Sequence, residues 1–381
     1  MEIRYALGIA VQQTLNRRAL LAGLAGGAAA MTLPARLLAQ TLGPDPGMIR
    51  LTSNENPYGP APSALKAAAD ASANGAFYPG RVTTELMQAI ADRHGLKREN
   101  VVLSSGSNEA LCAAANAWSK RGAIIAPSLT YDLHLGFASR IGAEVVRVPL
   151  DEDFGINLSR LEAAVDNSVS MVYVCNPNNP TGMTLDGDEL RDFCLSVGER
   201  ATVVVDEAYN ELTEKPDYTS MMDLVRDGRN VIVMRTFSKL FGMAGLRVGY
   251  AMGRPDLVAR VRHHITSWPN VVGLAAAYVS YSDDEFIRFS RNKIIEGRQI
   301  VVDALRGQGI EPLPSQTNFV YADIGRDVNE FAGLMRERNV QIRRSYAPHA
   351  THMRVSMGKI EELEVFADVF AELYSAGARA A

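Results

Sequence analysis

One lysine in this 381-residue chain occupies a position in which its amine could act as a nucleophile. Lys239 follows an apolar run, residues 230–234, that reads as a buried strand, and no charged residue lies closer to it than Arg235. Burial disfavours the charged form of an amine, so its pKa falls and it can form Schiff bases with carbonyl compounds. The alternative interpretation is a lysine that extends from the end of the strand into solvent.

Groups that suit a phosphate lie close to this lysine in the sequence. Thr236 and Ser238 supply hydroxyls, and Arg247 supplies a guanidinium that can pair with phosphate oxygens. Residues 101–110 read as a strand, a glycine-containing turn and a helix that begins near Ser107. The free N–H groups and positive dipole end of a helix favour a phosphate, although a plain helix with Ser107 as its N-cap would show the same pattern.

Two further polar stretches follow apolar strands. One is Asn-Pro-Asn-Asn-Pro-Thr-Gly at 176–182, which can continue neither helix nor sheet. It places Asn179 beyond the carboxyl end of a strand, where open α/β sheets bind ligands. Asp206 ends the next apolar strand, and a carboxylate buried there needs a partner such as a protonated ring nitrogen, unless it caps a helix. Tyr209 lies three residues beyond it.

These motifs together resemble those of fold-type I pyridoxal-phosphate enzymes. The stretch Ser-Lys-Leu-Phe-Gly-Met-Ala-Gly-Leu-Arg-Val-Gly at 238–249 resembles their cofactor-lysine motif, and the heptad at 176–182 matches their Asn-Pro-x-Asn-Pro-Thr-Gly. Asn-Glu-Asn-Pro-Tyr-Gly at 54–59 is similar to the opening motif of the histidinol-phosphate aminotransferase branch of the class I/II aminotransferases. The resemblance covers residues 48–375.

The resemblance implies a role for each motif residue. Lys239 would hold pyridoxal 5'-phosphate as a Schiff base and then, once displaced by the substrate amine, act as general base and acid. Asp206 would keep the pyridinium nitrogen protonated, while Asn179 and Tyr209 would contact the phenolate oxygen. Tyr131 would stack on the ring. The cofactor phosphate would contact Ser107, Asn108, Thr236, Ser238, Arg247 and, from the other subunit of a homodimer, Tyr78.

The same resemblance identifies three residues for the substrate. Arg354, in His-Met-Arg-Val-Ser-Met-Gly at 352–358, would form a bidentate pair with a substrate carboxylate. Arg343 aligns with a second arginine that serves a phosphate or a distal carboxylate, and Tyr58 would line the substrate pocket. A surface ion pair is the alternative for either arginine.

The implied function is a pyridoxal-phosphate-dependent aminotransferase that moves an amino group between an L-amino acid or histidinol phosphate and a 2-keto acid. A general or aromatic amino-acid aminotransferase fits the same motifs. So does an amino-acid phosphate decarboxylase, because the outcome depends on which substrate bond lies perpendicular to the cofactor ring. A cofactor-binding regulator without turnover is a further alternative, but it would need a DNA-binding module or a lost motif residue.

The resemblance also implies the fold class. It is an α/β fold whose large domain, residues 81–282, holds a mostly parallel seven-stranded sheet. Strands and helices within residues 283–381 predict a small α+β domain, to which the N-terminal arm at residues 41–80 contributes. The small domain is therefore expected to form from both ends of the chain.

Residues 1–40 differ in composition from the rest of the chain. They hold four arginines against one acid, although the whole chain carries a net charge of −4. Arg17 and Arg18 precede a weakly apolar, Gly/Ala-rich run, and the segment ends near Ala39. This pattern resembles a twin-arginine export signal and predicts a periplasmic enzyme. The alternative is an N-terminal helix or tail of a cytoplasmic enzyme.

The overall composition argues against several classes of function. Hydrophobic residues make up 47% of the chain and charged residues 22%, which is ordinary for a globular enzyme with a sizeable core. The net charge of −4 argues against a nucleic-acid partner. No apolar run has the length of a membrane span. Cys112, Cys175 and Cys194 are widely spaced, so we expect free thiols and no metal site.

Overall fold

The computed structural model describes residues 43–378. Contacts divide the chain into residues 1–47 and residues 48–381, and every helix and strand in the described part belongs to the second unit. The export signal expected at residues 1–40 lies outside the described residues and stays a prediction.

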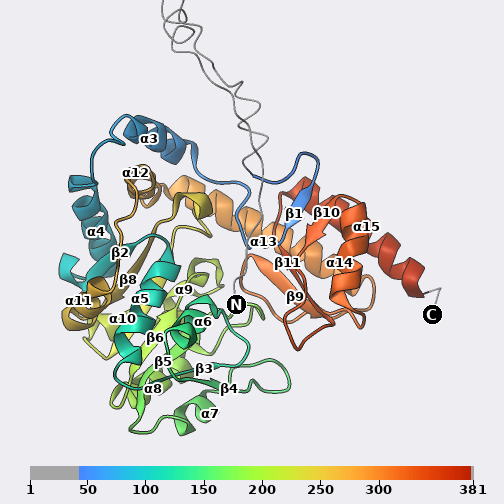
Figure 1. Ribbon diagram of the computed structural model, residues 1–381. Helices are drawn as coiled ribbons and strands as arrows, with labels where there is room; N and C mark the ends of the chain where they lie inside the picture. Colours follow the sequence, from blue (N-terminus) through green and yellow to red (C-terminus); the bar gives the residue numbers. More distant parts are fainter. Residues whose placement is uncertain (1–42, 379–381) are drawn as a thin grey trace, which may run out of the picture. The chain divides into compact units, whose positions relative to one another are not determined.

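A seven-stranded sheet forms the centre of the α/β region (Figure 1). Its strands lie in the order β2, β8, β7, β6, β5, β3, β4, and only β8 (Gly249–Gly253) runs antiparallel to its neighbours. The predicted α/β fold with a mostly parallel seven-stranded sheet is therefore confirmed. The other strands are β2 (Val101–Ser104), β3 (Ala123–Pro127), β4 (Val145–Val148), β5 (Val169–Cys175), β6 (Thr202–Asp206) and β7 (Val231–Thr236).

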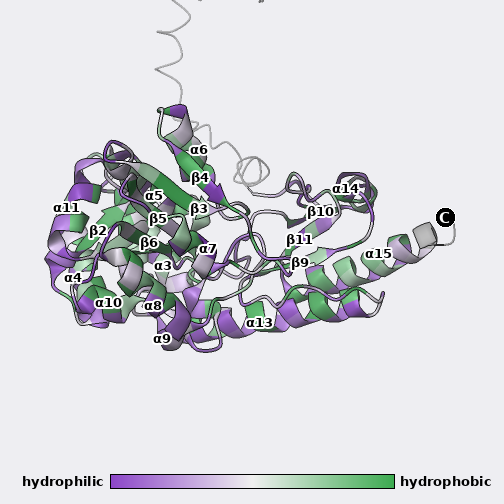
Figure 2. Ribbon diagram, turned by 90° about the horizontal axis from the view of Figure 1, so that it is seen from below, coloured by the Kyte–Doolittle hydropathy of each residue, from purple (hydrophilic) through white to green (hydrophobic). Residues whose placement is uncertain are grey.

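The central strands β5, β6 and β7 are buried along almost their whole length and are mostly apolar, because helices cover both faces of the sheet. Figure 2 shows hydrophobic residues on the strands and hydrophilic residues along the outer helices. One face packs against α5 (Ser107–Ser119), α6 (Leu133–Arg140) and α11 (Pro255–His263). The other face packs against α4 (Arg81–His94), α7 (Leu158–Ala163), α8 (Gly187–Gly198), α10 (Met222–Arg226) and α12 (Val271–Ser280).

Two small sheets lie outside this central sheet. β1 (Ile49–Leu51) pairs in parallel with β10 (Val340–Ile342), so the N-terminal arm joins the C-terminal part of the chain. β9 (Phe319–Asp323) and β11 (His352–Ser356) form an antiparallel pair. A small α+β region is thus built from both ends, as expected. Its helices are α13 (Asp284–Arg306), α14 (Val328–Glu337) and α15 (Ile360–Ala378).

The remaining α-helices of the described residues are α3 (Pro62–Ser72) and α9 (Pro216–Thr219), and three short 3-10 helices span Arg98–Asn100, Asn210–Leu212 and Ala244–Leu246. The three cysteines are free thiols, as expected. Within residues 43–378, no helix is long and apolar enough to cross a membrane. The same range holds no group of three or more His, Cys, Asp or Glu side chains that could bind a metal ion.

Candidate active site

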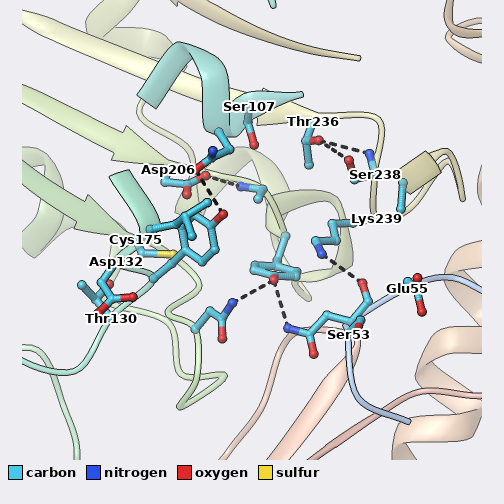
Figure 3. A pocket seen from close by; sticks show the side chains of 18 of the residues that line it. Ser53, Glu55, Ser107, Thr130, Asp132, Cys175, Asp206, Thr236, Ser238 and Lys239 are labelled. Atoms are coloured by element: carbon cyan, nitrogen blue, oxygen red, sulfur yellow. Dashed lines mark hydrogen bonds between the residues drawn. The ribbon is translucent and has the colours of Figure 1, made fainter. Parts of the chain in front are cut away.

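A cavity of about 450 Å³ opens where β5, β6 and β7 end (Figure 3). Open α/β sheets place ligands at this edge because the carboxyl ends of parallel strands meet there. The lining brings together most of the residues that the sequence predicts for the site. These are Ser107, Asn108, Tyr131, Asn179, Asp206, Tyr209, Thr236, Ser238, Lys239, Arg247, Arg343 and Arg354.

Lys239 lies in the loop after β7 and is partly exposed in the cavity. Its Nζ donates a hydrogen bond to the backbone oxygen of Asn54 at 3.0 Å and lies 5.5 Å from the centre of the Tyr209 ring. Burial lowers the pKa of Lys239 to about 8, and the nearby Arg354 cation acts in the same direction. An amine with this pKa is suited to both nucleophilic attack and proton transfer near neutral pH.

Asp206 is the last residue of β6 and is only 3% exposed. The Tyr173 hydroxyl donates to Oδ2 at 3.1 Å, and the backbone N–H of Ala208 donates to Oδ1 at 3.2 Å. Burial raises the pKa of Asp206 to about 6, while these two bonds and Lys239 favour the ionised form. A cationic ring nitrogen would suit this buried carboxylate.

One end of the cavity is rich in donors, and Figure 3 shows Ser107, Thr236 and Ser238 grouped there. The guanidinium of Arg247 donates to Ser238 Oγ at 3.4 Å, and the Thr236 hydroxyl donates to the same oxygen at 2.9 Å. The N-terminus of α5 adds unpaired backbone N–H groups. A cation, hydroxyls and a helix N-terminus together suit a phosphate group.

The turn before α5 differs from the expectation in one respect. Gly106, not Ser107, is the N-cap residue, because the chain turns there with a φ of 79° that favours glycine. A Cβ atom at Gly106 would lie 2.1 Å from Nη2 of Arg247, so any other residue there would require the guanidinium to move from its present position. Ser107 is the first helical residue, and its hydroxyl lines the cavity instead of capping the helix.

Tyr131 forms a wall of the cavity between this donor-rich end and the strand ends. Its hydroxyl donates to Asn108 Oδ1 at 3.2 Å, which ties the loop after β3 to the first turn of α5. Burial raises the pKa of Tyr131, so the phenol stays neutral. The arrangement leaves an aromatic wall next to the groups that suit a phosphate.

The Tyr209 hydroxyl is the centre of a buried amide network. It accepts hydrogen bonds from Asn54 Nδ2 at 3.1 Å and from Asn179 Nδ2 at 3.3 Å. Burial raises the pKa of Tyr209, so the phenol keeps its proton. With both amides donating to its oxygen, the hydroxyl can direct that proton toward a ligand in the cavity.

Arg354 is a buried cation that lacks a counter-anion. It is 4% exposed, and its guanidinium donates to Asn179 Oδ1 at 2.8 Å and to the backbone oxygen of Thr52 at 2.6 Å. Its Nε is buried without a partner, and no carboxylate within residues 43–378 forms an ion pair with it. A buried charge without a counter-ion is unfavourable, so an anionic ligand that pairs with the Arg354 guanidinium would be stabilised here.

The remaining predicted residues lie toward the surface. Arg343 is exposed at the edge of the cavity, with its guanidinium 4.8 Å from the centre of the Tyr346 ring. Tyr58 lies outside the lining, and its hydroxyl accepts a hydrogen bond from the backbone N–H of Ile360 at 2.9 Å. Tyr78 also lies outside it, is 90% exposed and contacts Trp268.

Three further residues belong to the site although sequence reasoning did not select them. Asn54 bonds to both Lys239 and Tyr209, Tyr173 bonds to Asp206, and Tyr346 lies between the two arginines. Asn54 had a usable signal, because it opens the motif at 54–59. Tyr173 carries a hydroxyl within a mostly apolar strand, which is a weaker signal.

The chain is similar to several known proteins. The family described as aminotransferase class I and II matches residues 46–370. A histidinol-phosphate aminotransferase of Moorella thermoacetica is 32% identical over 332 residues, which cover 86% of this chain and 85% of the relative. An aromatic amino acid aminotransferase of Thermobifida fusca is 36% identical over 336 residues, which cover 87% of this chain and 91% of the relative. The crystal structure of histidinol-phosphate aminotransferase from Sinorhizobium meliloti in complex with pyridoxal-5'-phosphate superimposes with a TM-score of 0.79, at 28% identity, over 93% of this chain and 99% of that one.

Proposed function

This chain belongs to the class I and II aminotransferases, and we propose that its amino donor carries an anionic group that pairs with Arg354. The chain is a transaminase that uses pyridoxal phosphate to move an amino group from an amino donor to a 2-keto acid. The single observation that supports the proposed donor is the buried Arg354 guanidinium without a counter-anion.

The cavity residues fit the cofactor. Arg247, Ser238 and the N-terminus of α5 would hold its phosphate, because they offer a cation, a hydroxyl and free N–H groups. Asp206 would hold its ring nitrogen, and Lys239 would hold its aldehyde carbon. When bound, the cofactor supplies an electron sink for the substrate carbon that loses a proton.

The chain's own side chains position the substrate and move its proton. Lys239 Nζ can accept the proton from the substrate carbon and return it, since its pKa lies near neutrality. Asp206 keeps a negative charge at the buried end of the cavity, and Tyr209 can donate a hydrogen bond into it. Arg354 would anchor the donor within reach of Lys239, because the Arg354 cation lies close enough to contribute to the lowered pKa of Lys239.

An L-amino acid fits this cavity when its carboxylate pairs with Arg354. Its side chain would then extend toward Tyr346 and Arg343 at the cavity edge. Histidinol phosphate is a second candidate, because Arg343 supplies the second cation that a phosphate dianion favours. Relatives that are 32% and 36% identical are named for histidinol phosphate and for aromatic amino acids, respectively, so both candidates have support.

A donor screen with an Arg354 variant tests this proposal. The holoenzyme is mixed with histidinol phosphate, histidine, aromatic amino acids and glutamate, and conversion of the cofactor and formation of the keto product are measured. In Arg354→Gln, we expect KM for the best donor to rise by about 30-fold, since a charge-assisted hydrogen-bonded pair contributes about 2 kcal/mol.

Arg338→Gln is the matched control, because Arg338 is an exposed arginine that pairs with Glu372. Its KM should equal that of the unmodified enzyme. An unchanged KM in Arg354→Gln would contradict the proposed donor anchor. Release of carbon dioxide in place of a keto product would identify a decarboxylase.

We further propose that the enzyme is a homodimer. Phe77, Tyr78 and Trp268 are 72%, 90% and 66% exposed and border one surface groove. Exposed aromatic side chains gathered in this way are typical of an interaction surface. In such a dimer, Tyr78 would reach the cofactor phosphate of the other subunit, which explains why it lies outside the cavity of its own chain.

A further inference from the structure

We propose that Asn54 is a positioning residue that orients the Lys239 amine and the Tyr209 hydroxyl during proton transfer. This inference rests on the proposed transaminase function. Asn54 lies in the N-terminal arm, only 2% exposed, and lines the cavity beside both residues. It contacts each of them with a different group.

The backbone of Asn54 contacts Lys239, and its side chain contacts Tyr209. Its carbonyl oxygen accepts a hydrogen bond from Lys239 Nζ at 3.0 Å. Its amide Nδ2 donates to the Tyr209 hydroxyl oxygen at 3.1 Å. One residue therefore fixes both of the proton-carrying groups on this side of the cavity.

The conformation of Asn54 is held by the small α+β region. Its φ is 53°, in the left-handed region that asparagine tolerates better than most residues. Ser356 Oγ accepts from the Asn54 backbone N–H at 2.9 Å and donates to Oδ1 at 2.7 Å. Asn318 Nδ2 donates to the Asn54 oxygen at 2.8 Å. These bonds aim the carbonyl at Lys239.

The orientation matters because a neutral amine has two N–H bonds and one lone pair. When the Asn54 oxygen accepts one N–H, the rotation of the amine is restricted, and the lone pair can be kept directed at the substrate carbon. The same oxygen also stabilises the protonated amine, which opposes the effect of burial on the pKa of Lys239.

β11 connects this arrangement to donor binding. Arg354, the proposed anchor for the donor anion, and Ser356, which holds Asn54, lie two residues apart on this strand. Residues two apart on a strand point to the same face. Arg354 also donates to Thr52, two residues before Asn54. The strand that binds the donor therefore also holds the group that orients the amine.

Substitutions at Asn54 and Ser356 test the inference. In Asn54→Ala, we expect the first-order rate constant of the donor half-reaction to fall about 10- to 100-fold while donor affinity changes little, because orientation acts on the reacting step. Asn54→Gly accommodates the φ of 53° but lacks the amide, so its loss should be smaller. Ser356 contacts Asn54 but neither Lys239 nor Tyr209. Ser356→Ala should nevertheless lower the same rate constant, because it loosens Asn54.

The pKa of Lys239 in the apoprotein gives a readout that does not depend on turnover. It is measured from the pH dependence of the rate at which the amine attaches to added pyridoxal phosphate. In Asn54→Ala, the midpoint should fall below that of the unmodified protein, because the bond from Ser356 to Oδ1 is lost and alanine is strained at a φ of 53°, so the carbonyl oxygen is aimed less firmly at the protonated amine.

Asn339→Ala is the matched control, because Asn339 is exposed and has a φ of 61°, so the substitution adds the same backbone strain far from the cavity. Its half-reaction rate and Lys239 midpoint should equal those of the unmodified protein. If Asn54→Ala lowers only the melting temperature, as Asn339→Ala is expected to do, the positioning role is wrong. If the unmodified enzyme converts no donor, the proposed function is wrong, and the apoprotein midpoint still tests Asn54.

Discussion

The pKa of Lys239 determines how readily the apoprotein can attach its cofactor. Burial and Arg354 lower this pKa from 10.5 to about 8. At pH 7, about a tenth of such an amine is neutral, against less than about a thousandth of an unperturbed lysine. Because only the neutral amine attacks an aldehyde, we expect the attachment rate to rise with pH and to level off above about pH 8.

Stopped-flow absorbance of the apoprotein mixed with pyridoxal phosphate measures this rate across the pH range. Lys239→Ala is the control, since it should show no absorption from covalently attached cofactor at any pH. A rate that keeps rising to about pH 10 would mean that Lys239 behaves as an ordinary solvated lysine.

Single residues were predictable from sequence where their chemistry conflicts with their surroundings. A lysine among apolar residues and an aspartate at the end of an apolar strand both indicate a special environment, and Lys239 and Asp206 line one cavity. Asn54 was not selected, because its role depends on partners that are 155 and 302 positions away, Tyr209 and Ser356. Contacts at such distances are set by the fold, so the motif at 54–59 marks Asn54 as a candidate without showing what it contacts.

At the scale of elements, the start of α5 determines how the phosphate end of the cavity is built. Gly106 turns the chain with a φ of 79°, and a Cβ atom there would lie 2.1 Å from Arg247. In Gly106→Ala the guanidinium must move, so we expect the dissociation constant for pyridoxal phosphate to rise at least about tenfold. Fluorescence or absorbance titration of the apoprotein measures this constant.

Gly142→Ala is the control that separates two effects of Gly106→Ala, the backbone strain of an alanine at positive φ and the displacement of Arg247. Gly142 has a φ of 88°, but a Cβ atom there would meet no atom within 4 Å. The control should therefore lower stability by about 1 kcal/mol through backbone strain and leave cofactor affinity unchanged. Equal affinities in the two variants would show that the turn before α5 does not shape the phosphate site.

Most elements follow from apolar patterns, but their ends depend on local polar groups. The sequence predicts a strand over residues 315–321, whereas β9 begins at Phe319. The hydroxyls of Ser315 and Thr317 both donate to the Phe319 backbone oxygen, which bends the chain before the strand. Such side-chain bonds compete with strand pairing and are difficult to foresee from hydrophobicity alone.

At the scale of the whole molecule, the sheet was predicted through the family resemblance and not through periodicity. Buried parallel strands are uniformly apolar, so their sequences do not specify their neighbours. The order β2, β8, β7, β6, β5, β3, β4 and the pairing of β1 with β10 therefore required knowledge of the fold. The partner of the exposed Tyr78 is likewise not specified by this chain alone.

Hybrid dimers test whether Tyr78 completes the site of a second copy. In the proposed homodimer, each site combines Lys239 of one subunit with Tyr78 of the other. Neither Lys239→Ala nor Tyr78→Ala homodimers should be fully active. A hybrid of the two variants contains one site in which both residues are intact. After equal amounts are unfolded and refolded together, about half of the dimers should be hybrids, so about a quarter of all sites are intact.

The expected activity of the refolded mixture is therefore about a quarter of that of the unmodified enzyme. This activity should be higher than the average of the activities of the two separately refolded variants. Separate refolding of each variant is the control, and size-exclusion chromatography checks that both still form dimers. Activity that merely equals the average of the separate samples would mean that Tyr78 acts within its own chain or not at all. Recovery on mixing requires that the site be shared, because no single polypeptide in the mixture carries both residues.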